Sequence, residues 1–97
     1  MRAVVWTESA KLDYWNNIDY LENKWTHKEV LFFIDKTNHL VHLLSKQNIL
    51  FKPTSYPNVF QVSVVKQILL FYRVSENESV VLLRFWNVLQ DPKKLIF

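Results

Sequence analysis

The sequence predicts a single α+β domain over residues 1–97: an N-terminal strand, an antiparallel two-helix hairpin, then a three-stranded antiparallel meander. Three observations lead to this fold class. Apolar residues recur at helical spacing between residues 8 and 45. The stretch KPTSYPN at 52–58 breaks that pattern with two prolines. Beyond it the period changes to that of strands. We expect both helices to cover one face of an antiparallel sheet.

The first strand and first helix occupy residues 2–24. RAVVW at 2–6 is short and rich in β-branched residues, which favours a strand. Thr7 is a suitable N-cap, with Glu8 in the first turn, where the helix dipole favours a carboxylate. The apolar spacing in the helix predicts a buried stripe of Tyr14, Ile18, Leu21 and Trp25, widened by Leu12 and Trp15.

The second helix is expected from about residue 27 to 45. THKE at 26–29 has the pattern of a capping box, in which Thr26 and Glu29 satisfy each other's backbone. A single cap residue between the helices predicts a tight antiparallel hairpin. Its expected apolar face consists of Val30, Phe33, Ile34, Thr37, Leu40, Val41 and Leu44.

Strands are expected at about 59–64, 65–74 and 79–86, with SENES at 75–79 as a hairpin loop. Pro92 ends the last strand, because proline cannot continue an interior ladder. The chain contains no glycine, so its turns must use other residues that tolerate unusual backbone angles. The asparagine candidates are Asn16, Asn17, Asn38, Asn48, Asn58, Asn77 and Asn87.

Composition excludes several classes of function. Without glycine there is no P-loop, no GxGxxG and no GxSxG elbow, and without cysteine there is no disulfide, thiolate metal site or cysteine nucleophile. We therefore expect no cofactor. The first residues do not form a signal peptide, and no apolar run is long enough to span a membrane, so we expect a soluble cytoplasmic protein without a membrane partner.

Two histidines and the many aromatic residues are weak functional signals. His39 and His42 share a helix face but have no further ligand nearby in sequence, so we expect no metal site. Tryptophan and phenylalanine could stack on bases, but most fall on the apolar stripes, which favours core packing. Trp86 is less settled because it lies where the last strand ends.

Cations within the predicted strands are the stronger signal. All the excess charge of +3 falls in residues 52–97, which hold six Lys and Arg against three Asp and Glu. Lys66, Arg73 and Arg84 lie in otherwise apolar strands, where a charge must reach solvent, a partner or a ligand. If Val74 pairs with Ser79, Arg73 and Arg84 share a sheet face and could bind phosphate or carboxylate. Snorkelling at the sheet edge is the competing interpretation.

Four stretches in this order resemble the RelE/ParE superfamily of bacterial type II toxin–antitoxin toxins. They are VVWTESAKLDYWNNIDYLENKW, FKPTSYPNVF, VVKQILLFYRV and LLRFWNVLQDPKKL, and the likeness covers nearly the whole chain. The resemblance implies a RelE/ParE-like fold, a cognate antitoxin as partner and a toxin–antitoxin hetero-oligomer. It further implies growth inhibition, either by cleavage of mRNA in the ribosome or by poisoning of DNA gyrase, and a role of the kind called plasmid stabilisation.

The sequence departs from this family where basic residues are often found. Leu89, Gln61 and Val62 stand at such positions, and each lost transition-state contact typically costs about 3–4 kcal/mol. This favours a ParE-like toxin that acts by binding, through Arg73, Arg84, Trp86, Lys93 and Lys94. The alternative is a RelE-type endoribonuclease with Lys66, Arg73 and Arg84 as catalytic residues. A further alternative is a degenerate toxin that only binds its antitoxin.

Overall fold

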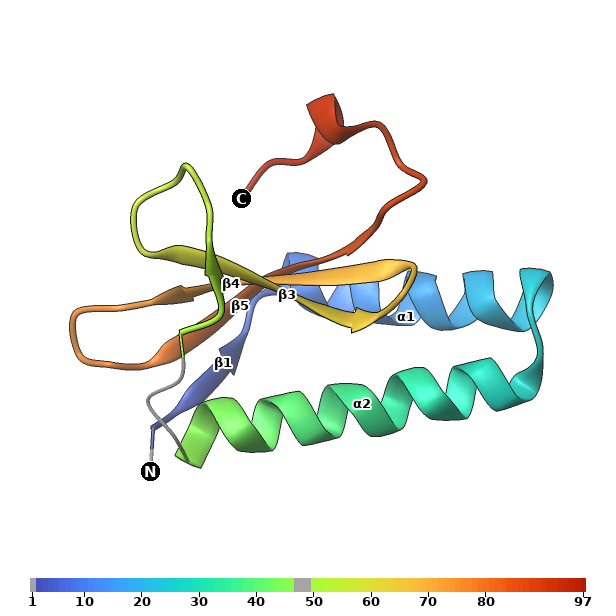
Figure 1. The fold of residues 1–97 in the computed structure, drawn as a ribbon, viewed down its shortest axis with the longest axis horizontal. Helices are drawn as coiled ribbons and strands as arrows, with labels where there is room; N and C mark the ends of the chain where they lie inside the picture. The colour runs from blue at the N-terminus through green and yellow to red at the C-terminus, as the bar shows by residue number, and fades with distance from the viewer. Residues whose placement is uncertain (1, 47–49) are drawn as a thin grey trace.

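The computed structural model describes residues 2–46 and 50–97. Two helices and a five-stranded sheet confirm the α+β prediction, and Figure 1 shows the helices on one side of the sheet and the C-terminal segment on the other. The sheet order is β1-β5-β4-β3-β2. The elements are β1 (Val4–Trp6), α1 (Glu8–Lys24), α2 (His27–Lys46), β2 (Lys52–Pro53), β3 (Val59–Val65), β4 (Ile68–Val74), β5 (Val80–Asn87) and the 3₁₀ turn η1 (Pro92–Lys94).

The sheet is mixed, so the expectation of an antiparallel sheet was wrong for the first strand. β1 runs parallel to β5, with Val4 opposite Val80 and Trp6 opposite Leu82. The helical hairpin carries the chain away from β1 and back, so that β1 pairs with the last strand instead of the next one. Periodicity within a segment does not specify its partner, which is why the sequence did not reveal this pairing.

Two further differences concern strand boundaries. The proline-rich break contains a short edge strand, β2, in which Pro53 is tolerated because one side of an edge strand has no ladder to complete. A second hairpin turn separates β3 from β4, so Lys66 lies in a turn and not inside a strand as expected. The 75–79 loop is confirmed, but Val74 pairs with Val80 and not with Ser79.

The main core lies between the helices and the sheet. The predicted apolar face of α2 is confirmed, since Phe33 and Leu44 are completely buried within it. In α1 the prediction was wrong for Leu12, Trp15 and Trp25, which are 63%, 63% and 48% exposed. The buried residues of α1 are Ala10, Asn17 and Leu21, because this helix packs mainly along one strand, β5, and covers only a narrow stripe.

Local signals placed the start of α1 correctly. The Thr7 hydroxyl oxygen accepts a hydrogen bond from the Ala10 N–H at 3.0 Å, as an N-cap should, and the hydroxyl donates to the Leu82 carbonyl at 2.8 Å. The cap therefore also ties α1 to β5. No described helix has the length and apolar character needed to cross a membrane.

Turns without glycine are built from other residues. Asn58 takes a positive φ of 61°, as expected for an asparagine turn, but the second left-handed residue is Glu78, with φ 65°. The Asn77 side chain supports that loop by accepting from the Ser79 N–H. Of the other candidates, Asn48 lies outside the described residues, whereas Asn16, Asn17 and Asn38 lie within helices.

Candidate functional site

The face of the sheet that points away from the helices, here called the outer face, carries its own small apolar cluster. Val59, Phe71, Leu83 and Trp86 are buried there, although neither α1 nor α2 covers them. The C-terminal segment crosses this face instead, as Figure 1 shows. The Phe97 ring lies 5.2 Å from the Phe71 ring. The outer face is therefore a shielded surface and not an open sheet.

The register of the strands brings polar residues into line across the outer face. Lys52 of β2 pairs with Gln61, Gln61 with Phe71, and Phe71 with Arg84. Directly paired residues present their side chains on the same face, so these four form one row about 14 Å long. Arg73, opposite Val81, lies in a neighbouring row on this face.

The prediction that Arg73 and Arg84 share a face therefore agrees with the register, although the register is not the expected one. Pairing of Val74 with Val80 instead of Ser79 would by itself place Arg84 on the face opposite Arg73. A bulge opposite Phe71 and Tyr72 adds one residue to β5, which returns Arg84 to the same face as Arg73. Lys52 was missed by sequence reasoning. The only available signal was a lysine next to a proline at the edge of an irregular stretch.

Arg84 is held by an ion pair with Asp13 of α1. Its Nε donates to Asp13 Oδ2 at 2.6 Å and its Nη2 to Asp13 Oδ1 at 3.0 Å, which is a bidentate arrangement. The side chains of Arg84 and Asp13 are only 17% and 13% exposed. Hydrogen bonding to Asp13 raises the pKa of Arg84, although burial acts in the opposite direction. The guanidinium therefore stays charged and is neutralised within the protein.

The remaining contacts of Arg84 fix it further. Its Nη1 donates to the Ile96 carbonyl at 3.0 Å, and its guanidinium lies 5.3 Å from the centre of the Trp86 ring. Three of its five N–H groups are thus engaged within the chain. A guanidinium bound on three sides is poorly placed to bind a phosphate.

Asp13 and Asn17 also complete the edge of β5 beyond the end of β1. The Phe85 N–H donates to Asp13 Oδ2 at 3.1 Å, and the Asn17 amide donates to the Phe85 carbonyl at 2.9 Å. The two residues lie one helical turn apart on α1, so both reach the same strand. These side chains replace the neighbouring strand that the edge would otherwise lack.

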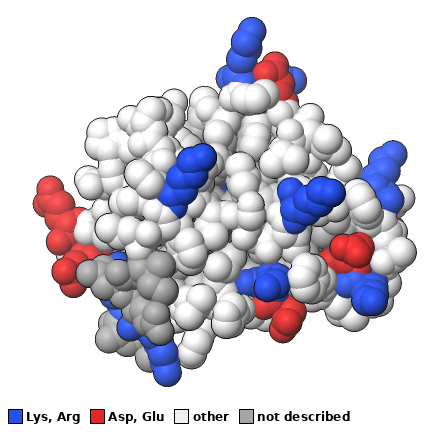
Figure 2. Space-filling view, viewed as in Figure 1, with Lys and Arg blue, Asp and Glu red and all other residues white. Residues whose placement is uncertain are grey.

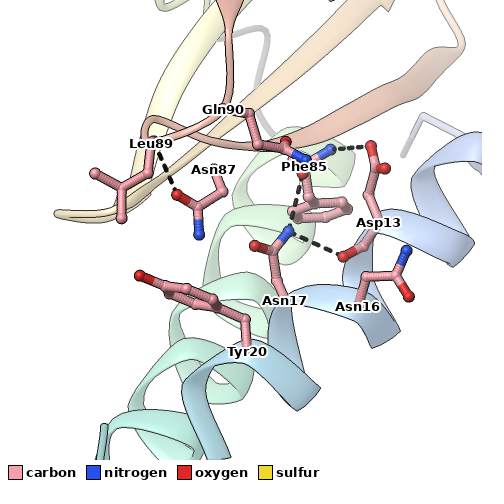
Figure 3. A pocket seen from close by; sticks show the side chains of 8 residues that line it. All are labelled: Asp13, Asn16, Asn17, Tyr20, Phe85, Asn87, Leu89 and Gln90. Carbon is pink, nitrogen blue, oxygen red and sulfur yellow. Dashed lines mark hydrogen bonds between the residues drawn. The ribbon is translucent and has the colours of Figure 1, made fainter. Parts of the chain in front are cut away.

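A hollow of about 200 Å³ opens between α1 and the end of β5, next to this junction. Figure 3 shows side chains from both elements around it. Asp13 is its only charged residue, and that charge is already neutralised by Arg84. The hollow therefore offers amides and a phenol but no cation for a phosphate. Its lining is Asp13, Asn16, Asn17, Tyr20, Phe85, Asn87, Leu89 and Gln90.

The three cations predicted for a nuclease do not converge. Lys66 is exposed in the β3–β4 turn, whereas Arg73 is exposed near the far end of β4. Arg73 lies seven positions after Lys66 along this hairpin, which corresponds to about 20 Å. Arg84 of β5 pairs with Phe71, two residues before Arg73 on β4, so it lies between these two ends of the hairpin. Only Arg73 and Arg84 are neighbours.

The predicted partner-binding residues form a looser group on the outer side of the sheet. Trp86 is 5% exposed and belongs to the apolar cluster, so it packs beneath the surface of the outer face. Lys93 and Lys94 are exposed on η1. On the face in Figure 2, Lys and Arg side chains are scattered among uncharged surface instead of forming one basic patch.

The three positions at which the sequence resemblance leads us to expect basic residues have different surroundings. Leu89 is 73% exposed at the mouth of the hollow. Gln61 lies in the same row as Arg84 on the outer face, but Val62 packs against the main core on the opposite face. Of the two β3 positions, only Gln61 could place a cation on the outer face.

Within residues 2–46 and 50–97, no three or more His, Asp or Glu side chains come together in a way that could hold a metal ion. His39 and His42 are exposed on α2.

No protein-family model matches the chain, and no curated protein is significantly similar in sequence. Solved structures match in fold. A chain from the chromosomal ParDE toxin–antitoxin system of P. aeruginosa superposes with a TM-score of 0.74 at 18% identity, over 90% of this chain and 96% of that one. The chain has the fold of ParE- and YoeB-type toxins.

Two other toxins show the same architecture. A copper-bound mutant toxin from Helicobacter pylori matches with a TM-score of 0.63 at 16% identity, over 90% of this chain and 94% of that one. The YoeB/ParE toxin from Agrobacterium tumefaciens matches with a TM-score of 0.58 at 15% identity, over 88% and 96% of the two chains. At these identities the likeness establishes the shared fold, and the function has to be argued from the site.

Proposed function

We propose that this protein is the toxin of a type II toxin–antitoxin pair, that a cognate antitoxin neutralises it, and that it acts by binding its target in the manner of ParE. The fold supports the first part, since a chain of a ParDE toxin–antitoxin system is among its structural neighbours. Large apolar side chains left exposed on the isolated domain support a protein partner. On α1 these are Leu12 and Trp15, each 63% exposed.

One observation favours binding over RNA cleavage: Arg84, the cation within the LLRFWNVLQDPKKL motif, is paired with Asp13. Cleavage of RNA needs cations whose charge is available to the phosphate as negative charge develops on it. The hollow beside Arg84 has no free cation among its lining residues, and Leu89 occupies the position where the sequence resemblance leads us to expect one. The geometry is better suited to a protein surface, which uses charge for orientation and association rate.

The target we propose is DNA gyrase. The contact surface we propose is the outer face with the C-terminal turn. Arg73, Lys93 and Lys94 are exposed there, while Arg84 and Trp86 hold the surface in shape. Because the first three of these residues are exposed cations, the association should weaken as salt concentration rises.

A RelE-type nuclease is the second candidate, and one arrangement favours it. Lys52 and Arg84 lie in one row of the outer face, with Arg73 in a neighbouring row. A bound RNA that displaces the C-terminal segment would meet these cations. Lys66 would then act from the end of the sheet, too far from Arg73 to contact the same phosphate.

Controlled expression in a bacterial host, with and without the gene that neighbours the toxin gene, tests the toxin proposal. Growth arrest that is relieved by the neighbour's product, together with co-purification of the two proteins, is the expected result. Loss of DNA supercoiling by purified gyrase in the presence of the toxin is expected as well. Normal growth together with a stable complex would leave only the antitoxin-binding module.

A matched pair of charge-reversal variants tests whether inhibition of gyrase depends on the outer face. Arg73→Glu should reduce gyrase inhibition at least tenfold, because it reverses an exposed charge at the proposed contact. Lys46→Glu makes the same change at an exposed position at the end of α2 and should leave inhibition unchanged. Equal effects of the two variants would point to general charge and not to the outer face.

A further inference from the structure

The exposed side of α2 carries a second apolar surface that the proposed function does not use. Leu31 and Phe32 are 54% and 48% exposed there. Lys28 and Asp35 flank them at helical spacing, so the four residues share one side of the helix, opposite the buried Val30, Phe33 and Thr37 stripe. We call Lys28, Leu31, Phe32 and Asp35 the α2 patch.

The shape of this patch suits a protein partner. A shallow hollow of about 630 Å³ lies over it, and Glu29 completes the lining. The Lys36 ammonium lies 5.5 Å from the centre of the Phe32 ring. Phe32 is thus held from one side by its own helix and remains open toward solvent.

The charges around the patch balance. Lys28 and Lys36 oppose Glu29 and Asp35, so the local sum is zero. A nucleic acid or a strongly acidic protein would meet no net attraction here. The partner must itself present an apolar centre with both signs of charge around it.

The order of the residues along the helix is complementary to that of a second, antiparallel copy of this chain. A two-fold axis passing between Leu31 and Phe32 places two antiparallel α2 helices side by side. Each residue of one copy then faces the residue of the other copy that lies at the same distance from the axis along the helix. Leu31 faces Phe32 of the second copy, and Lys28 faces Asp35, and both pairs occur twice.

We propose that the α2 patch is the interface of a symmetric homodimer. Because Lys28 and Asp35 are equidistant from the axis and opposite in sign, the antiparallel arrangement is complementary in charge as well as in shape. The parallel arrangement would instead place like charges together. An isologous interface requires this self-complementarity, whereas a different partner does not.

The extent of the contact sets its strength. α2 begins at His27, which would face Lys36 of the second copy, so the helices overlap over about 15 Å around the axis. Beyond that point the partner helix runs past the hairpin turn, where Trp25 is 48% exposed. A contact of this size is at the low end for specific interfaces, so the dimer should dissociate in the micromolar range.

Sedimentation equilibrium of the isolated chain at about 50 mM salt, over a wide concentration range, measures the dimer directly. Lys28→Asp and Asp35→Lys should each raise the dissociation constant about tenfold or more, because each variant turns both symmetric attractions into repulsions. The double variant K28D/D35K should restore the wild-type constant. An equimolar mixture of the two single variants should form a heterodimer. One variant then carries acidic side chains at both positions, the other carries basic side chains at both, and opposite charges face each other across the axis.

Two substitutions to serine test whether the dimer depends on the α2 patch or on any exposed aromatic residue. Phe32→Ser should abolish the dimer, whereas Trp15→Ser, at a comparably exposed aromatic residue of α1, should leave it intact. Circular dichroism checks that each variant is folded.

A chain that stays monomeric at millimolar concentration, or a double variant that fails to restore the dimer, overturns the proposal. So does a patch whose variants weaken only binding of the antitoxin, since the patch would then belong to that partner. Self-association is measured without reference to toxicity, so the proposed function can fail while the dimer stands.

Discussion

Replacing Asp13 by alanine should be among the most damaging single changes in this domain. The Asp13 carboxylate accepts three hydrogen bonds, from Arg84 Nε at 2.6 Å, Arg84 Nη2 at 3.0 Å and the Phe85 N–H at 3.1 Å. Asp13→Ala removes all three at once. It leaves a guanidinium that is 17% exposed and a backbone N–H of β5 without their partner.

The size of the effect follows from burial. Removing one member of a buried ion pair costs about 3–5 kcal/mol, and this pair is slightly exposed, so we expect about 3 kcal/mol for Asp13→Ala. Arg84→Met keeps an apolar stem and leaves Asp13 its hydrogen bond from the Phe85 N–H, so it should cost less, about 2 kcal/mol. Once Asp13 is gone, Arg84 has already lost its ion pair and two of its three hydrogen bonds. The double variant should therefore cost about 3 kcal/mol and not the sum of about 5 kcal/mol.

Urea denaturation followed by circular dichroism at pH 7 measures these free energies of unfolding. The raised pKa of Arg84 means that its contribution is fully present below the pKa of an unfolded arginine and is lost only in strong alkali. The ion pair is therefore complete at pH 7. Asp19→Ala is the matched control, since Asp19 is exposed on the same helix, and it should change stability by less than about 0.5 kcal/mol. A loss below about 1 kcal/mol for Asp13→Ala, or additive effects in the double variant, would refute this reasoning.

Three other results are expected. Glu78→Gly should stabilise the domain by about 0.5–1 kcal/mol in the same urea assay, because Glu78 has φ 65°, whereas Glu76→Gly in the same loop should destabilise it; the reverse order would contradict the left-handed turn. Burial raises the pKa of Tyr14, so stability should fall as the pH rises above about 10, and Tyr14→Phe should lessen that fall relative to wild type; an unchanged alkaline profile would count against this. Elemental analysis of tag-free, dialysed protein should find no stoichiometric zinc or nickel at His39 and His42, and one equivalent of either metal would overturn that expectation.

Local patterns predicted the helices better than the sheet. The apolar face of α2 could be identified because its period is set by the helix itself, and Phe33 and Leu44 are buried as expected. The parallel pairing of β1 with β5 could not, because a short strand does not encode its neighbour. Trp15 was misplaced since an apolar residue on the flank of a stripe is buried only where another element covers it.

The candidate site was only partly predicted, because its contacts join segments that are distant in the sequence. Arg84 stood out as a cation within an apolar strand, but its partner Asp13 lies 71 residues away in the chain. A weak signal for that partner was present: Asp13 and Asn17 are polar, one turn apart, and close to the predicted stripe of α1. Asn17 is only 6% exposed, which helical spacing alone did not indicate. A lysine beside a proline was the only signal for Lys52, and it does not indicate the residue's place in the row, because that place depends on the pairing of β2 with β3.

Cleavage of ribosome-bound mRNA in a purified translation system tests most directly whether this protein acts by binding or by catalysis. Wild type, Arg73→Ala and Lys66→Ala should be compared, because Arg73 and Lys66 are exposed and their replacement should leave the fold intact. We predict no cleavage in the A site above that of a reaction without toxin, for all three proteins. Cleavage by wild type that falls about 100-fold in either variant, the size of a lost transition-state contact, would contradict the binding mechanism and establish the nuclease.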